Sequence, residues 1–164
     1  MLNALSFIGR HNAGKTTLLT NLINLLSENG YKVGVIKHAH ADLKIPLAKD
    51  SEKLFLAGAS QVYVSSPKIT INYRRQAAEK TLTELYESLN NDLDLILVEG
   101  FKEEDLPKIE VVRAEINPTP ILAPNTIALV TDIPMELDLP IFGFTEIELL
   151  LNFIISYFNL QQTS

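Results

Sequence analysis

Residues 9–16 read GRHNAGKT, which fits the pattern G-x-x-x-x-G-K-[ST] of a phosphate-binding loop, or P-loop. The glycines allow a tight backbone turn whose N–H groups can surround phosphate oxygens. Lys15 supplies a cation for the β- and γ-phosphates, and the Thr16 hydroxyl is a ligand for Mg²⁺. The positions expected to bind a nucleotide are Gly9, Asn12, Ala13, Gly14, Lys15, Thr16 and Thr17. The alternative is a glycine-rich connector with a solvated lysine.

The sequence on either side of this loop predicts a strand and a helix. Residues 4–8 form a short apolar run, and residues 17–28 place leucines at helical spacing. Residues 31–37 predict a second strand. Strand, loop, helix and strand in this order form a βαβ unit, which is normally parallel and right-handed.

Short apolar runs and helical patterns continue along the chain. They predict strands at residues 61–65, 69–73, 93–98, 109–112, 127–130 and 141–144, and helices at 51–57, from about 78, and at 146–158. The runs at 61–65 and 69–73 are candidates for an antiparallel hairpin at a sheet edge. The last helix is either a core helix or a subunit contact. We expect a single P-loop nucleotide-binding domain over residues 1–164, an α/β fold with a mostly parallel sheet flanked by helices.

The composition narrows the class of protein. The 164 residues include 20 acidic and 14 basic side chains, giving a net charge of −6, and no cysteine. A duplex-binding surface needs a basic face, so nucleic acid is a poor candidate partner. The lack of cysteine excludes disulfides and thiolate metal sites. No apolar run of 18 residues predicts a membrane span, and no signal-peptide pattern is present, so we expect a cytoplasmic protein.

Glu99 is the candidate second acid of a P-loop site. It follows the apolar run 95–98 and precedes Gly100, so it falls where a strand ends. Parallel sheets bind ligands at this end of their strands. We expect Glu99 to act on Mg²⁺ or on the attacking water, the alternatives being a helix cap or a structural ion pair. Asp94, at the other end of the run, is expected to be structural.

The loop after the second predicted strand is polar. His38 and His40 are candidates for contact with phosphate or an anionic substrate, and Asp42 for contact with Mg²⁺ through water. A dedicated metal site made by these three residues is an alternative, although their spacing matches no strong metal pattern. Asp50 is either a helix N-cap or a catalytic residue.

Charged residues in the second half offer further candidates. Asp132 follows the predicted strand at 127–130 and either reads a guanine base or forms a turn before Ile133-Pro134. Arg113, Lys102 and Lys108 are candidates for binding an anionic cofactor phosphate, or are ordinary surface charges.

Four segments occur in an order that resembles the MobB family, the adaptors of molybdopterin-guanine dinucleotide synthesis. They are GRHNAGKTTL, VIKHAHAD, KDSEKLFLAGA and LILVEGFKEEDLPKIEVVR, and the resemblance covers residues 2–132. It implies a cytoplasmic, dimeric GTP-binding protein with weak GTPase activity that uses GTP and Mg²⁺. It also implies two partners, a MobA-type guanylyltransferase and molybdopterin or its dinucleotide form.

The resemblance assigns roles by position. Gly14, Lys15 and Thr16 hold nucleotide and Mg²⁺, Glu99 is the acid near the metal, and the segment from His38 and His40 to Asp50 flanks the phosphates. Guanine preference rests mainly on the resemblance. Where the family commonly has Asp and then Pro-Gly, this chain has Pro46, Leu47 and Ala48.

Two rival functions share the same fold class. A small-molecule kinase would need a lid with arginines, and residues 115–140 contain no Arg or Lys. A GTP-dependent metallochaperone would use His38 and His40, but the lack of cysteine disfavours it. Hydrolysis is expected to be slow, because the motifs provide no water-positioning Gln and no arginine finger. The candidate dimer surfaces are the last helix and the strand at 69–73.

Overall fold

The computed structural model describes residues 3–39, 43, 49–90 and 92–161. The chain forms two compact units, one of residues 1–38 and 85–164 and the other of residues 39–84. The first unit contains the phosphate loop. The single nucleotide-binding domain expected over residues 1–164 stays a prediction, because compactness does not distinguish an insertion from a separate domain.

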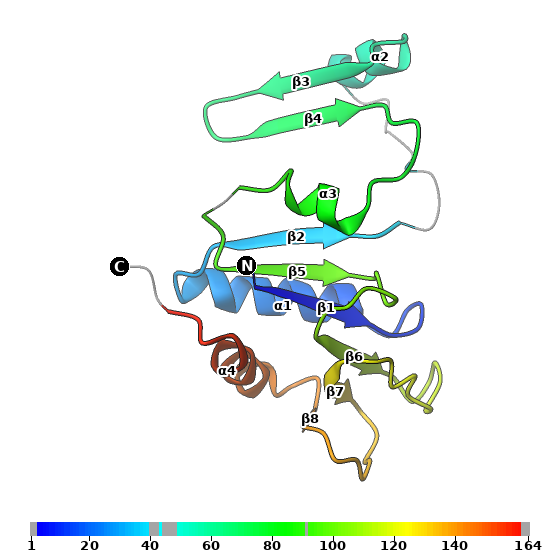
Figure 1. Ribbon diagram of the computed structural model, residues 1–164, viewed down its shortest axis with the longest axis vertical. Helices are drawn as coiled ribbons and strands as arrows, with labels where there is room; N and C mark the ends of the chain where they lie inside the picture. Colours follow the sequence, from blue (N-terminus) through cyan, green and yellow to red (C-terminus); the bar gives the residue numbers. More distant parts are fainter. Residues whose placement is uncertain (1–2, 40–42, 44–48, 91, 162–164) are drawn as a thin grey trace. The chain divides into compact units, whose positions relative to one another are not determined.

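The first unit contains a six-stranded parallel sheet (Figure 1). Its strand order is β2-β5-β1-β6-β7-β8, and every neighbouring pair is parallel. The strands are β1 (Ala4–Ile8), β2 (Val33–Lys37), β5 (Leu95–Glu99), β6 (Lys108–Val112), β7 (Thr126–Thr131) and β8 (Ile141–Phe142). The carboxyl ends of all six strands therefore share one edge. This confirms the predicted α/β fold and places the segments that follow β1, β2, β5, β6 and β7 at that edge.

Helices α1 (Lys15–Glu28) and α4 (Ile147–Phe158) contribute to the core of the first unit. Leu22 of α1 and Ile154 of α4 are fully buried, together with alternate strand residues such as Phe7 and Leu97. Alternate residues of a strand point to the same face, so both helices pack on one face of the sheet. Helix α4 is therefore a core helix, the first of the two alternatives predicted from its apolar sequence.

The first helix and second strand begin at different residues from those predicted. Helix α1 starts at Lys15, directly after Gly14, which has a left-handed φ of 92°. Strand β2 starts at Val33 because the main chain of Lys32 is already engaged: its N–H donates to the Asp94 carboxylate (2.7 Å) and its carbonyl accepts from the Asp94 N–H (2.9 Å). The structural role expected for Asp94 is confirmed.

The third helix is shorter than predicted. Helix α3 spans Leu82–Tyr86 rather than starting near residue 78. Thr81 fixes this start, because its N–H donates to the Glu84 carboxylate (2.8 Å) while the Glu84 N–H donates to the Thr81 hydroxyl (3.3 Å). This reciprocal arrangement is a capping box, which satisfies N–H groups that a helix start leaves unpaired.

The second unit contains helix α2 (Asp50–Leu56) and the antiparallel strands β3 (Gln61–Ser65) and β4 (Thr70–Arg74). The hairpin is confirmed, but it forms a two-stranded sheet of its own and is not an edge of the larger sheet. Phe55 of α2 joins the helix to the hairpin: its ring lies 5.8 Å from the Tyr73 ring, and its carbonyl accepts from Arg75 (2.7 Å).

The alternative that Asp50 is a helix N-cap is wrong. Lys49 occupies the N-cap position, and its N–H donates to the carboxylate of Glu52 (2.9 Å). Asp50 is the first helical residue, and its exposed carboxylate pairs with Lys53 at 3.0 Å. Its proposed role near the phosphates stays a prediction.

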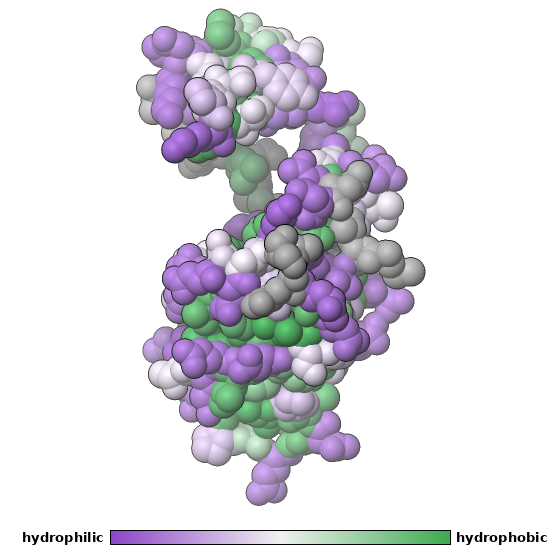
Figure 2. All heavy atoms as spheres, turned by 90° about the vertical axis from the view of Figure 1, so that its left-hand side faces the viewer, coloured by the Kyte–Doolittle hydropathy of each residue, from purple (hydrophilic) through white to green (hydrophobic). Residues whose placement is uncertain are grey.

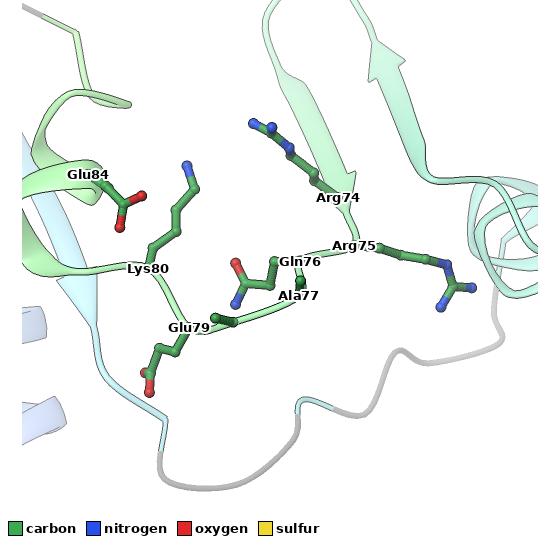
Figure 3. A pocket seen from close by; sticks show the side chains of 8 residues that line it. Arg74, Arg75, Gln76, Ala77, Glu79, Lys80 and Glu84 are labelled. Carbon is green, nitrogen blue, oxygen red and sulfur yellow. The ribbon is translucent and has the colours of Figure 1, made fainter.

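A shallow pocket of the second unit lies between the end of β4 and the segment that leads to α3 (Figure 3). Arg74 and Lys80 line it together with Glu79 and Glu84, so cations and anions are mixed. Arg75, also in its lining, donates to the Phe55 carbonyl and places its guanidinium 4.6 Å from the Phe55 ring centroid. This mixture of charges selects no particular ligand.

Candidate functional site

The phosphate loop connects β1 to α1, and its conformation requires glycine at both ends. Gly9 has a φ of 140°, and a Cβ there would lie 2.3 Å from the carbonyl oxygen of Val111. Gly14, at 92°, immediately precedes the first residue of α1. Asn12 also has a left-handed φ, 61°, which asparagine tolerates better than most residues. The loop thus brings the start of a helix to the carboxyl end of β1, the arrangement that binds phosphate in P-loop proteins.

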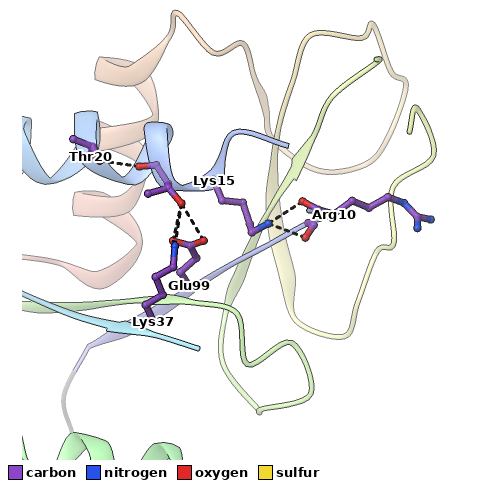
Figure 4. Close-up of polar contacts among 7 residues, drawn as sticks. Arg10, Lys15, Thr20, Lys37 and Glu99 are labelled. Atoms are coloured by element: carbon purple, nitrogen blue, oxygen red, sulfur yellow. Dashed lines mark hydrogen bonds and ion pairs between the residues drawn. The ribbon is translucent and has the colours of Figure 1, made fainter. Parts of the chain in front are cut away.

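The remaining predicted positions of this loop differ in exposure. Ala13 is buried in the core, so only its backbone can face a ligand. The side chains of Asn12 and Thr17 are exposed. Arg10 is also exposed, and Figure 4 shows its side chain directed away from Lys15.

Lys15 folds back over the loop. Its ammonium donates to the carbonyls of Gly9 (3.0 Å) and Arg10 (2.8 Å), as Figure 4 shows. Partial burial lowers the pKa of Lys15, and nearby Lys37 lowers it further, whereas Glu99 raises it. An anion bound in the loop would favour the charged form of this ammonium.

Three side chains meet beside the loop, from three different elements (Figure 4). The Thr16 hydroxyl lies 3.1 Å from each carboxylate oxygen of Glu99. The Lys37 ammonium lies 2.8 Å from Glu99 Oε2 and 3.2 Å from the Thr16 hydroxyl. Glu99 is therefore at the predicted place, at the end of β5, with its side chain only 13% exposed.

Sequence reasoning did not assign a role to Lys37. It is the last residue of β2, and β2 pairs with β5 in a register that sets Lys37 opposite Glu99. A lysine at the end of a predicted strand was the available signal, but the neighbour of that strand was not known.

The donor set of this cluster fits Mg²⁺. Mg²⁺ prefers oxygen ligands and is usually held by one or two carboxylates together with phosphate oxygens and water. Thr16 and Glu99 supply a hydroxyl and a carboxylate, and Lys37 already balances the charge of Glu99. Among the described residues no three His, Cys, Asp or Glu side chains gather to hold a metal by themselves.

His38 lies next to this cluster. Its backbone N–H donates to the Glu99 carbonyl (2.9 Å), and the centroid of its ring lies 4.7 Å from that of the Phe101 ring. Gly100 makes this approach possible, because a Cβ at Gly100 would lie 2.9 Å from the His38 Cβ. The other two candidates of this loop, His40 and Asp42, lie outside the described residues.

A second group of residues lies on the other side of the loop, after β6, β7 and β8. Asp132 accepts from the Ala114 N–H (2.8 Å), and its other oxygen lies 3.6 Å from Arg113 Nη1. The Arg113 guanidinium lies 3.7 Å from the centroid of the Phe144 ring. A Cβ added at Gly14 would lie 3.1 Å from the Arg113 Nη2. Asp132 joins the segments after β6 and β7, and its reading of guanine stays a prediction.

Lys108 does not bind a cofactor phosphate, contrary to one hypothesis from the sequence. It is 1% exposed, and its ammonium donates to the carbonyls of Glu104 (2.6 Å), Leu106 (3.0 Å) and Pro124 (3.1 Å). Three acceptors satisfy all three protons of the ammonium. This lysine therefore connects the segment before β6 to the segment before β7. Lys102 is exposed and lies 3.5 Å from Glu103.

No helix in the described parts of the chain is long and apolar enough to cross a membrane.

Comparisons with known proteins give consistent results. A profile of the family described as "MobB: Molybdopterin guanine dinucleotide synthesis protein B" matches residues 4–132. The molybdopterin-guanine dinucleotide biosynthesis adapter protein of Escherichia coli is 34% identical, over 98% of this chain and 96% of that protein. The protein of the same name from Haemophilus influenzae is also 34% identical, over 92% of this chain and 86% of that protein.

Solved structures resemble the fold. A crystal structure of molybdopterin-guanine biosynthesis protein B has a TM-score of 0.75 and 29% identity, covering 95% of this chain and 99% of that one. The crystal structure of Bacillus subtilis MobB has a TM-score of 0.75 and 26% identity, covering 99% of this chain and all of that one.

Proposed function

Because this chain belongs to the MobB family, we propose that it is a GTP-binding adapter in the synthesis of molybdopterin-guanine dinucleotide. The observation that carries the GTP-binding part is the meeting of Thr16, Glu99 and Lys37 beside a phosphate loop. The hydroxyl and the carboxylate are ligands suited to Mg²⁺, and the ammonium and the nearby start of helix α1 are suited to the negative charge of a triphosphate.

In this proposal each residue of the site has a defined task. The N–H groups of the loop and the Lys15 ammonium bind the β- and γ-phosphates, so Lys15 exchanges its two carbonyl acceptors for phosphate oxygens. Thr16 and Glu99 would hold Mg²⁺, which supplies positive charge to the phosphates. Lys37 is then displaced from the Glu99 carboxylate, with which it pairs at 2.8 Å.

The proposed hydrolysis of GTP is slow. Glu99 is the candidate for orienting the attacking water, but in this proposal the same carboxylate, with Thr16, would hold Mg²⁺. The Arg113 guanidinium lies on the other side of β1 from Glu99, where Asp132 and Phe144 hold it, so it is away from the Mg²⁺ end of the proposed site. This arrangement favours a protein that holds GTP over one that turns it over quickly.

The proposed partners are a MobA-type guanylyltransferase and molybdopterin or its dinucleotide form, in the cytoplasm. The experiment is capture of the purified guanylyltransferase by this chain with GTP·Mg²⁺, with GDP·Mg²⁺ and without nucleotide. GTP-dependent capture that is lost in Lys15→Ala supports the adapter. The matched control is Lys32→Ala, which removes one positive charge near Asp92, at the amino end of β2. Equal capture under all conditions would contradict a nucleotide-dependent adapter.

We also propose a homodimer that uses the second unit. Its side chains Leu54, Tyr63 and Ile69 are 61%, 66% and 65% exposed, so large apolar side chains of this unit face solvent and are available for a contact with a second copy. Figure 2 shows hydrophobic atoms at the surface of this part of the chain. Light scattering at micromolar concentration should give twice the mass of 18.3 kDa, and Ile69→Lys should lower it. A monomeric wild type would contradict the dimer.

A further inference from the structure

Arg113 stands at the phosphate loop on the side away from Glu99. The sheet order places β5, which ends in Glu99, on one side of β1 and β6, which precedes Arg113, on the other. The Arg113 Nη2 would be 3.1 Å from a Cβ at Gly14. A glycine at this position lets a ligand approach the backbone closely, and the guanidinium already lies on that side.

Two neighbours hold the guanidinium in place. The Phe144 ring lies beneath it at 3.7 Å, and the Asp132 carboxylate lies 3.6 Å from Nη1. The two terminal nitrogens therefore have different surroundings, Nη1 facing Asp132 and Nη2 facing the loop. An arginine fixed in this way loses little side-chain freedom when an anion binds to it.

Arg113 is the last basic residue of the sequence, and the charged residues that follow it are all acidic. No lysine, arginine or histidine follows it in the sequence, whereas Glu115, Asp132 and Glu146 do. An anionic ligand that extends from the loop toward β7 and β8 would therefore meet acidic groups, with Arg113 as the one compensating charge from this part of the sequence.

We infer that Arg113 binds the α-phosphate of the nucleotide, supported from below by Phe144. This inference rests on the proposed GTP binding. Thr16 and Glu99 fix the Mg²⁺ end of the nucleotide, where the β- and γ-phosphates lie, so the α-phosphate extends toward the opposite side of β1. A guanidinium recognises phosphate with paired N–H groups, and the nitrogen that faces the loop is available for this contact.

The test is the affinity of the full chain for GTP, GDP and inorganic tripolyphosphate, each with Mg²⁺, measured by calorimetry. We expect Arg113→Ala to weaken all three by the same factor, about tenfold to a hundredfold, since all place a phosphate at the α position. Arg113→Lys keeps the charge but loses the fork, so it should recover only part of the affinity. Phe144→Leu, which removes the ring but keeps an apolar side chain, should weaken binding about threefold to tenfold.

The outcomes separate this inference from the proposed function. Lys32→Ala is the control for loss of one charge and should bind all three ligands as the wild type does. A loss confined to GTP and tripolyphosphate would place Arg113 at the γ-phosphate, and a loss confined to the two nucleotides would place it at the base or ribose. Either result, or unchanged binding by Arg113→Ala while Lys15→Ala loses it, overturns the inference alone. A wild type that binds no nucleotide overturns the proposed GTP binding itself. Thermal unfolding of each variant shows whether it is folded.

Discussion

Gly9 provides a sharp test of how tightly the phosphate loop is fixed to the sheet. Its φ of 140° is unfavourable for any residue with a side chain, and a Cβ there would lie 2.3 Å from the Val111 carbonyl oxygen. That oxygen belongs to the backbone of β6, which pairs with β1 on one side and with β7 on the other. It therefore cannot move away without disturbing both pairings.

The expected cost of Gly9→Ala has two parts. The backbone conformation costs about 1–3 kcal/mol in a residue that is not glycine. Relief of the contact requires the Cβ and the oxygen to separate from 2.3 Å to at least 3.0 Å, which loosens the end of the β1–β6 pairing. One weakened hydrogen bond adds about 1 kcal/mol. We expect the free energy of unfolding to fall by about 3 kcal/mol, or the Tm by about 6–12 °C.

Gly30→Ala is the matched control for this measurement. Gly30 also has a positive φ, 83°, but a Cβ there meets no atom within 4 Å. This substitution therefore carries only the backbone cost, about 1–2 kcal/mol. The assay is urea unfolding of the wild type and both variants, followed by far-UV circular dichroism. Equal losses in the two variants would refute the argument from the Val111 contact.

Three further substitutions test other parts of the first unit. Lys108→Met should lower the free energy of unfolding by about 3–5 kcal/mol in the same urea assay, because it leaves three inward-facing carbonyls without their donor. The Tyr86 hydroxyl is buried without a hydrogen-bond partner in the described part of the chain, and burial raises the pKa of Tyr86 to about 12. Since this exceeds the ordinary value near 10, the hydroxyl ionises more readily in the unfolded chain, and the folded state loses stability as the pH rises from 10 to 12. In thermal unfolding, the stability of Tyr86→Phe should fall less than that of the wild type over this pH range. At pH 7 the variant should be no less stable than the wild type. Lys37→Met should lower the Mg²⁺ concentration for half-maximal GDP binding about threefold or more in calorimetry, because Glu99 loses its competing ammonium.

The fold and the phosphate loop could be predicted because their signals are local. The G-x-x-x-x-G-K-[ST] pattern, the apolar run before it and the helical leucines after it lie within the first 28 residues. Glu99 could be predicted for the same reason, since an acid between a buried strand and a glycine is visible in a few adjacent residues. The ends of elements were less certain, because partners such as Asp94 and Thr81 determine them.

The sequence left Lys37 without a role and could not decide between the alternatives for Lys108 and Arg113, because the surroundings of these side chains depend on distant segments. Lys37 reaches Glu99 only because β2 and β5 are neighbours in the sheet. Lys108 is satisfied by carbonyls on both sides of it in the chain, including that of Pro124. Arg113 gains its position from Phe144, whose place follows from the order of β6, β7 and β8.

Titration of the wild type and Lys15→Ala with GTP, ATP and GDP in the presence of Mg²⁺ tests the central claim most directly. We expect GTP to bind more tightly than ATP, and Lys15→Ala to weaken GTP binding at least about tenfold, because the loop loses its phosphate-binding cation. Preference for ATP would favour a small-molecule kinase instead. Absence of GTP binding by the wild type, or GTP binding that Lys15→Ala leaves unchanged, would contradict a GTP-dependent adapter built on this loop.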